Sequence, residues 1–211
     1  MSYKTIKYDV KDNVATITLN RPETYNSLNL AMLKDLTHAF RAIKQDAKAR
    51  AVILTGEGRG FSSGADLMEI QSQIANINIT ETLRCGLNII VESMRVLEKP
   101  IICAVNGVAA GAGASICLAS DYRIASKNAG FVFAAFVNIG LVPDAGSTYL
   151  LQKLVGPAKA FELLMLADSK NRIDAQTAHQ LGIINHVVAH DDLMQETSTL
   201  ATKLATMPTK A

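Results

Sequence analysis

The sequence predicts an α/β protein, because short apolar strands alternate with amphipathic helices along the chain. Of the 211 residues, 49% are hydrophobic and 19% are charged, so one domain, with at most a short appendage, can bury a full core. The order of strand, strand and helix recurs, which hints at a structural repeat. The sequence contains no linker and no low-complexity tract.

The elements of the first half follow from the spacing of apolar residues. Alternating residues in VATITL predict a β-hairpin whose turn is Lys11-Asp12-Asn13. Apolar residues at helical spacing predict a helix from Leu30, with Asn29 as its N-cap. The expected strands cover residues 3–10, 14–19, 51–54 and 101–105. Further helices are expected at residues 65–74 and 83–97, and a flexible glycine loop at residues 56–60.

The second half continues the alternation. Pro157 fits the first position of a helix, where its missing N–H costs nothing. The expected strands cover residues 122–125, 131–134 and 183–188. The expected helices start near Gly111-Ala112-Gly113, cover residues 147–155, 157–166 and 174–181, and begin again at Asp191. Residues 139–146 are expected to form a loop.

Residues 101–120 combine an apolar strand, an Asn106-Gly107 turn and a helix start rich in small residues. The first N–H groups of a helix have no partner inside it, and small residues let a ligand approach the backbone. The expected ligand of these N–H groups is an anion or an oxyanion that develops during a reaction. Close packing with no ligand is the alternative, because Ile116 replaces the third glycine of a dinucleotide fingerprint. The glycines in the run disfavour a membrane span.

Composition excludes several classes of function. A net charge of +2 is too small to indicate nucleic-acid binding, and the charged N-terminus MSYKTIKYDV does not resemble a secretory signal. The odd set of Cys85, Cys103 and Cys117 lacks C-x-x-C spacing and favours reduced thiols in a cytoplasmic protein. The four histidines show no metal-binding spacing, so no metal site is expected.

A second glycine loop contains Gly60-x-Ser62-x-Gly64, the pattern of a serine-hydrolase nucleophile elbow. An elbow needs a strand that runs directly into the serine, whereas a glycine-rich loop separates Thr55 from Ser62. A serine hydrolase that uses Ser62 therefore remains an alternative from a different class of enzyme.

Several motifs together resemble the enoyl-CoA hydratase/isomerase (crotonase) superfamily. They are NRPETYNSLN, RGFSSGADL, GVAAGAGAS, GLVPDAGST and LGIINHVV, and they extend over nearly the whole chain. The resemblance implies a crotonase-like spiral of strand–strand–helix units with a helical C-terminal region. Residues 1–195 would form the acyl-CoA-binding core, and residues 196–211 would begin the helical trimerisation region. The implied partners are an acyl-CoA substrate and further copies of the chain, as a homotrimer or hexamer, with no nucleic acid and no membrane.

The resemblance also implies the roles of individual residues. The backbone N–H groups of Ala65 and Ala112 would donate hydrogen bonds to the thioester oxygen of the substrate when an enolate forms. Coenzyme A would be part of the substrate, so no separate cofactor is expected. The matching substrate-binding positions are Tyr25, Ser27, Ser63, Asp66, Leu67, Gly111, Ser115 and Phe136.

The acid–base residue distinguishes two branches of the superfamily. Hydratases use two glutamates, whose matching positions here are Ser115 and Phe136. Asp144 instead lies in GLVPDAGST, which resembles the isomerase branch, including isomerases of ring epoxides. Apolar neighbours should raise the pKa of the Asp144 carboxyl and suit it to proton transfer. The alternative is an aspartate that caps the helix at Ser147.

The expected function is therefore an acyl-CoA isomerase that shifts a double bond, or opens a ring epoxide, through an enolate. The alternatives are an enoyl-CoA hydratase of fatty-acid or aromatic-acid degradation, and a non-catalytic member that binds RNA or a protein partner.

Overall fold

The computed structural model describes residues 3–73, 86–137, 140–166 and 172–209. A larger sheet of six strands has the order β1-β2-β3-β5-β7-β10, and only the β1–β2 pair is antiparallel. Its strands are β1 (Ile6–Lys11), β2 (Val14–Leu19), β3 (Ala51–Gly56), β5 (Ile101–Val105), β7 (Tyr122–Ser126) and β10 (His186–Val188). The predicted α/β class is confirmed.

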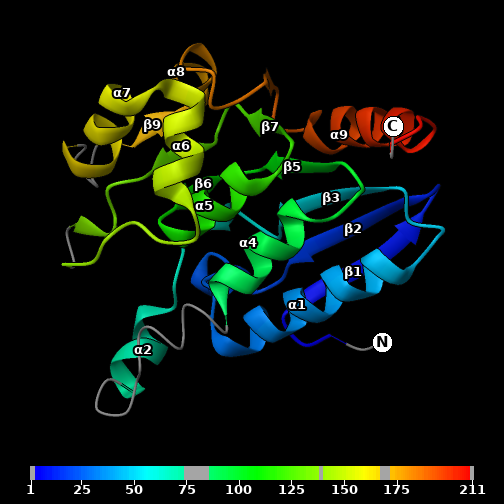
Figure 1. Cartoon of the computed structure of the whole chain (residues 1–211), viewed down its shortest axis with the longest axis horizontal. Helices are drawn as coiled ribbons and strands as arrows, with labels where there is room; N and C mark the ends of the chain where they lie inside the picture. Colours follow the sequence, from blue (N-terminus) through cyan, green and yellow to red (C-terminus); the bar gives the residue numbers. More distant parts are fainter. Residues whose placement is uncertain (1–2, 74–85, 138–139, 167–171, 210–211) are drawn as a thin grey trace.

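Helices cover both faces of the larger sheet (Figure 1). The strand β3 is buried along its whole length, and its residues alternate between the two faces. Val52 and Leu54 pack with the side chains of α1 and α4, whereas Ala51 and Ile53 pack with α9. The helices are α1 (Leu30–Gln45), α2 (Leu67–Gln73), α4 (Leu87–Arg95), α5 (Ala112–Ala119), α6 (Ser147–Val155), α7 (Pro157–Phe161), α8 (Ala175–Gln180) and α9 (Leu193–Ala205).

The predicted local signals of the N-terminal region are confirmed. The β1–β2 hairpin turns at Asp12 and Asn13, which both have positive φ, as a tight hairpin turn requires. The helix α1 begins at Leu30, and the Oδ1 atom of Asn29 accepts a hydrogen bond from the Met32 N–H at 2.9 Å.

A smaller sheet of four strands contains three strands that the sequence did not predict. Its order is β4-β6-β8-β9, with β4 (Gly60–Ser62), β6 (Val108–Ala110), β8 (Gly130–Val132) and β9 (Ile173–Asp174). β4, β6 and β9 lack a readable pattern, because they have two or three residues and the first two lie beside glycines. The parallel β4–β6 pair brings the two glycine loops side by side.

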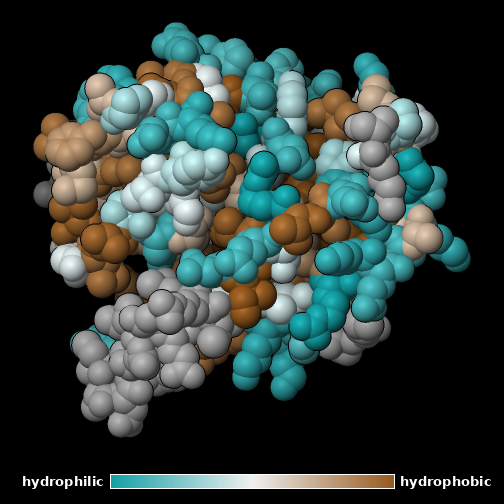
Figure 2. Space-filling model, viewed as in Figure 1, coloured by the Kyte–Doolittle hydropathy of each residue, from teal (hydrophilic) through white to brown (hydrophobic). Residues whose placement is uncertain are grey.

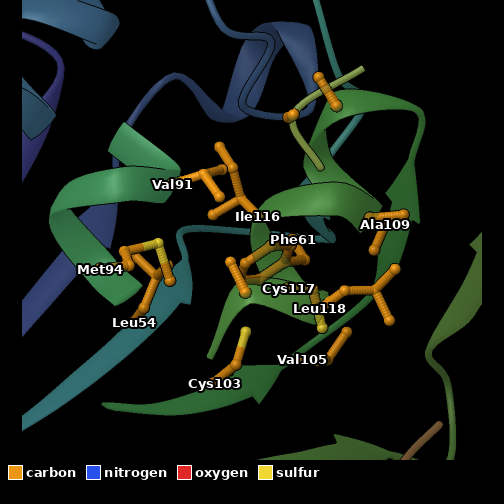
Figure 3. Close-up of a cluster of buried hydrophobic side chains, with 14 of the residues drawn as sticks. Leu54, Phe61, Val91, Met94, Cys103, Val105, Ala109, Ile116, Cys117 and Leu118 are labelled. Atoms are coloured by element: carbon orange, nitrogen blue, oxygen red, sulfur yellow. The ribbon is translucent and has the colours of Figure 1, made fainter. Parts of the chain in front are cut away.

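Phe61 anchors β4 to the helix that follows the second glycine loop. Its ring is fully buried in the main core, and Figure 3 shows it beside Ile116 and Cys117 of α5. The two thiols of the described part, Cys103 and Cys117, are buried and free, as predicted. Burial is the main reason why the pKa of the Cys103 thiol lies well above its usual value. Cys85 lies outside the described residues.

Several predicted boundaries differ from the structure. The helix predicted from residue 65 begins at Leu67, and the final helix, predicted from Asp191, begins at Leu193. The helix predicted at 157–166 ends at Phe161 and is followed by a π-helical turn at Glu162–Leu166. The strands predicted at 131–134 and 183–188 are shorter. Leu83, in the predicted helix 83–97, lies outside the described residues, and the predicted domain boundary at residue 195 falls inside α9.

Apolar side chains gather on the outer surface of the molecule around α7 (Figure 2). The most exposed of them in this region are Phe161 and Leu166, and Met165 is exposed to a smaller degree. The trimer or hexamer implied by the resemblance remains a prediction. In the described part of the chain, no helix is long and apolar enough to cross a membrane.

Candidate active site

The first glycine loop presents the N–H group of Ala65. Gly64 has a φ of +89°, which favours glycine, and its carbonyl oxygen accepts a hydrogen bond from the Leu28 N–H at 2.8 Å. The N–H and C=O groups of a trans peptide point in opposite directions, so the Ala65 N–H points away from Leu28. Within the described residues this N–H group has no hydrogen-bond acceptor.

Ala65 does not lie at a helix start, which corrects the prediction. It forms a parallel bridge with Leu28, and the Asp66 N–H donates to the Leu28 carbonyl at 3.2 Å. The Oδ1 atom of Asp66 accepts from the Glu69 N–H at 3.3 Å, so Asp66 rather than Gly64 precedes the helix. Ala65 is therefore held by hydrogen bonds on both sides.

The second glycine loop presents the N–H group of Ala112, the first residue of α5, as predicted. Gly111 has a φ of +50°, and its carbonyl oxygen accepts from the Ser115 N–H at 3.0 Å. By the same planarity, the Ala112 N–H points out of the helix start. In the described part of the structure it has no acceptor either.

The two donor loops are in direct contact. A Cβ atom on Gly64 would lie 2.7 Å from the Ala110 carbonyl oxygen and 3.2 Å from the Ala112 nitrogen. A side chain at position 64 would therefore collide with the second loop and cover its donor. Two free N–H groups on adjoining backbones can stabilise the negative charge of an enolate oxygen.

The predicted substrate-binding positions around the first loop are joined by hydrogen bonds. The Ser63 N–H donates to the Tyr25 carbonyl at 2.8 Å, and the Ser63 hydroxyl donates to the Thr24 carbonyl at 2.9 Å. Tyr25 and Leu67 are about half exposed as whole residues, at 45% and 51%. Ser63, two residues before Ala65, is thus tied to the segment that carries Tyr25.

Arg21 organises the same loop, and the sequence analysis missed it. Its Nη1 atom donates to the Ser27 hydroxyl at 2.9 Å and to Oδ2 of Asp66 at 2.8 Å. Partial burial alone would raise the pKa of the Asp66 carboxyl, but the hydrogen bonds from Arg21, the Glu69 N–H and Ser27 lower it. Arg21 lies in the motif NRPETYNSLN, so its place in that motif could have indicated a role in the first loop.

Asp144 lies in the loop before α6; the residue is half-buried, and its Oδ1 atom is fully buried. Its Oδ1 atom has no hydrogen-bond partner among the described residues. Burial raises the pKa of its carboxyl from 3.8 to about 6, although its own backbone N–H acts in the opposite direction. The next residue, Ala145, is buried with a φ of +49°, an uncommon conformation for alanine.

The Asp144 side chain does not cap the following helix. The Ser147 N–H and hydroxyl both donate to the Asp144 backbone carbonyl, at 3.0 and 2.8 Å, and not to the carboxylate. The N-cap of α6 is Gly146, which has no side chain. The capping alternative is therefore wrong.

Phe136 and Ser115 both lie next to Gly111, the residue before the second donor, Ala112. A Cβ atom on Gly111 would lie 3.7 Å from the Phe136 ring, and the Phe136 carbonyl accepts from the Leu141 N–H at 2.9 Å. Phe136 therefore lies beside the residue that precedes the second donor and is hydrogen-bonded to Leu141, three residues before Asp144. Ser115 is fully buried, and its hydroxyl donates to the Gly111 carbonyl at 3.2 Å.

Ser62 cannot act as a nucleophile in this structure. It is fully buried at the end of β4, and its hydroxyl donates to the Asn26 carbonyl at 2.9 Å. Two histidines have other partners: His190 bonds the Ser126 hydroxyl, and His179 bonds the Ile184 carbonyl. The serine hydrolase alternative is therefore wrong for Ser62. Among the described residues, no cluster of histidine, cysteine and acidic side chains could hold a metal ion.

Comparisons with known proteins give the family and fold to which this chain is similar. The family model for enoyl-CoA hydratase/isomerase matches residues 9–211. The chain is 41% identical to 1,2-epoxyphenylacetyl-CoA isomerase of Escherichia coli, over 95% of this chain and 76% of that protein. It is 36% identical to short-chain-enoyl-CoA hydratase of Clostridium acetobutylicum, over 97% and 76%. The crystal structure of an enoyl-CoA hydratase from Mycobacterium avium subsp. paratuberculosis superimposes with a TM-score of 0.88 at 30% identity, over 100% and 82% of the two chains. The predicted crotonase-like fold is confirmed.

Proposed function

Because this chain belongs to the enoyl-CoA hydratase/isomerase family, we propose that it is an acyl-CoA isomerase in which Asp144 transfers the proton. The observation that carries the proposal is the Asp144 carboxylate, whose buried Oδ1 atom has no partner among the described residues. Asp144 follows Leu141 in the same loop, and Leu141 is hydrogen-bonded to Phe136 beside the second donor loop. The similarity to a 1,2-epoxyphenylacetyl-CoA isomerase supports the same choice.

In the proposed reaction the thioester oxygen of a 3-enoyl-CoA accepts hydrogen bonds from the Ala65 and Ala112 N–H groups. The Asp144 carboxylate removes a proton from C2, and the electron pair spreads over the dienolate from C4 to the thioester oxygen. The protonated carboxyl then returns a proton to C4, so the double bond moves from C3–C4 to C2–C3. Each donor to the oxyanion contributes about 3–4 kcal/mol in comparable sites.

The raised pKa of the Asp144 carboxyl suits both halves of this reaction. A carboxyl with a pKa of about 6 is a stronger base than an ordinary aspartate, yet it remains ionised at neutral pH. It can therefore accept the proton in the first step and return it in the second. Opening of a ring epoxide would use the same enolate stabilisation.

Hydration is the second candidate, because the chain is also similar to a short-chain-enoyl-CoA hydratase. Hydration adds a proton to one carbon and hydroxide to the next, so water must be activated by a base while an acid protonates carbon. The positions that match the two hydratase glutamates carry Ser115 and Phe136, which cannot serve as carboxylates. This difference favours isomerisation.

The test is a direct comparison of the two reactions by mass spectrometry. The protein is incubated in D2O with a 3-enoyl-CoA and, separately, with crotonyl-CoA. We expect conversion of the 3-enoyl-CoA to its 2-enoyl isomer to be faster than hydration of crotonyl-CoA, with deuterium at C4 only to the extent that the Asp144 carboxyl exchanges its proton with solvent before returning it. Efficient hydration that survives Asp144→Asn would show that the assignment of the site is wrong. A phenylacetyl-CoA ring epoxide serves as the third substrate.

A further inference from the structure

We propose that Ser62 is a positioning residue that fixes the distance between the two N–H donors. The inference rests on the proposed function, because it assigns a role within the same oxyanion site. Ser62 belongs to the Gly60-x-Ser62-x-Gly64 motif, which resembles a nucleophile elbow but cannot act as one here.

Ser62 is bonded to the first donor loop. Its Oγ atom accepts a hydrogen bond from the Gly64 N–H at 3.2 Å and donates one to the Asn26 carbonyl at 2.9 Å. The first bond stabilises the turn in which Gly64 adopts its positive φ. Since Gly64 forms the peptide that carries the Ala65 N–H, the Ser62 hydroxyl helps to set the direction of the first donor.

Ser62 is also packed against the second donor segment. A Cβ atom on Gly113 would lie 2.7 Å from Oγ of Ser62 and 2.6 Å from its carbonyl oxygen. Gly113 directly follows Ala112 in the first turn of α5. One fully buried side chain therefore contacts both donor segments, and its size limits how closely they approach.

A buried amide network prevents Ser62 from shifting. The Nδ2 atom of Asn26 donates to the Gly60 carbonyl at 2.8 Å, and Nδ2 of Asn106 donates to the same oxygen at 3.2 Å. Asn26 comes from the first segment of the chain, and Asn106 comes from the turn before the second donor loop. The strand β4, which ends at Ser62, is therefore fixed to both segments.

Loss of the hydroxyl should change catalysis more than substrate binding. Ser62→Ala leaves the Gly64 N–H and the Asn26 carbonyl without their partner, so the Ala65 peptide can rotate away from the oxyanion. A small misplacement of donors costs transition-state stabilisation first, so we expect kcat to fall about ten- to a hundredfold. KM should change less than kcat, because the donors bind the oxyanion of the transition state more strongly than the carbonyl of the bound substrate.

Ser126 provides a matched control. It is also fully buried at the end of a strand, β7, and its hydroxyl also accepts from the backbone N–H two residues later, that of Asn128, at 3.1 Å. Ser126→Ala therefore removes the same type of turn bond, and additionally the bond to His190, at a place that contacts neither donor segment. Both variants should lose similar thermal stability, but only Ser62→Ala should lose kcat.

The test uses infrared difference spectra of butyryl-CoA labelled with ¹³C at the thioester carbonyl. We expect the wild-type protein and Ser126→Ala to shift the carbonyl stretch to lower frequency, and Ser62→Ala to reduce that shift. If Ser62→Ala does not fold, Ser62→Cys keeps a side chain of similar shape with much weaker hydrogen bonds and should also reduce the shift. An undiminished shift and kcat in the folded variant would overturn this inference alone. A wild-type protein that binds butyryl-CoA without any shift would overturn the proposed oxyanion site and this inference with it.

Discussion

The two N–H donors and the Asp144 carboxylate lie in regions that the protein holds in place by different means. Each donor belongs to a peptide whose carbonyl is itself hydrogen-bonded, Gly64 to the Leu28 N–H and Gly111 to the Ser115 N–H. Asp144, by contrast, has a buried Oδ1 atom for which the described part of the chain provides no hydrogen-bond partner. Its position depends on burial and on the left-handed backbone of Ala145, a conformation that costs about 1 kcal/mol or more.

This difference matches what each region has to do. A donor to an oxyanion keeps the same state throughout the reaction, so rigid hydrogen bonds improve it. An acid–base carboxyl changes its charge twice, and a hydrogen bond that stabilised one state would hinder the other. We therefore expect changes in the Asp144 loop to affect proton transfer, and changes in the donor loops to affect oxyanion stabilisation but not the proton-transfer group itself.

The largest expected effect comes from Asp144→Asn, which keeps the shape of the side chain and removes the base. Isomerisation of a 3-enoyl-CoA should fall by about 10² to 10⁴-fold, with binding of the thioester retained. Asp174→Asn is the matched control, because Asp174 caps α8 by accepting from the Thr177 N–H at 2.6 Å and asparagine caps equally well. Steady-state rates of the two variants check the prediction. Equal rates would place the proton transfer elsewhere.

Ala112→Pro tests the donor side of the comparison. Ala112 is the first residue of α5, where proline is tolerated, and proline replaces the N–H hydrogen with a ring carbon that cannot donate. A loss of about 10² to 10³-fold in kcat is expected. Ala65 is less suitable for this substitution, since it lies in a bridge with Leu28 before α2. Ala175→Pro, at the first position of α8, is the control, and a similar loss there would mean that proline damages the fold in general.

The burial of Asp144 should also cost stability at neutral pH. A carboxyl whose pKa rises from 3.8 to about 6 on folding prefers its neutral form in the folded state, so its ionisation opposes folding. The penalty is fully present above about pH 6, amounts to about 2–3 kcal/mol, and disappears as the pH falls through the unfolded value. Urea unfolding should find Asp144→Asn more stable than wild type at pH 7 and equal to it near pH 4. The same difference at both pH values would contradict the prediction.

A smaller effect is expected on the pH dependence of kcat/KM. The ionised carboxylate is the active base, so activity should decline as the pH falls through about 6. At pH 5 the rate should be about tenfold below its plateau, because only about a tenth of the carboxyl remains ionised. Rates measured in buffers of constant ionic strength test this point. A flat profile between pH 5 and pH 8 would mean that another group limits the reaction.

Local signals made part of this structure predictable. The Asp12-Asn13 turn, the Asn29 cap and the glycine before each donor all act within a few residues. The burial of Asp144 was also predictable from its apolar neighbours. The short strands β4 and β6 were not, since they form only when segments far apart in sequence pair with each other. For the same reason, the spacing of residues along the chain could not predict the hydrogen bond from Arg21 to Asp66 or the packing of Ser62 on Gly113.

The parallel pairing of the strands has a consequence for how the protein acquires its activity during folding. Apart from the β1–β2 hairpin, the larger sheet joins segments that are distant in sequence, and the β4–β6 pair joins the two donor loops in the same way. Such contacts form slowly, because a long stretch of chain must be ordered before they are made. During refolding, helical signal should therefore return before catalytic competence, and nascent chains that end before β6 should contain the first donor loop without its partner.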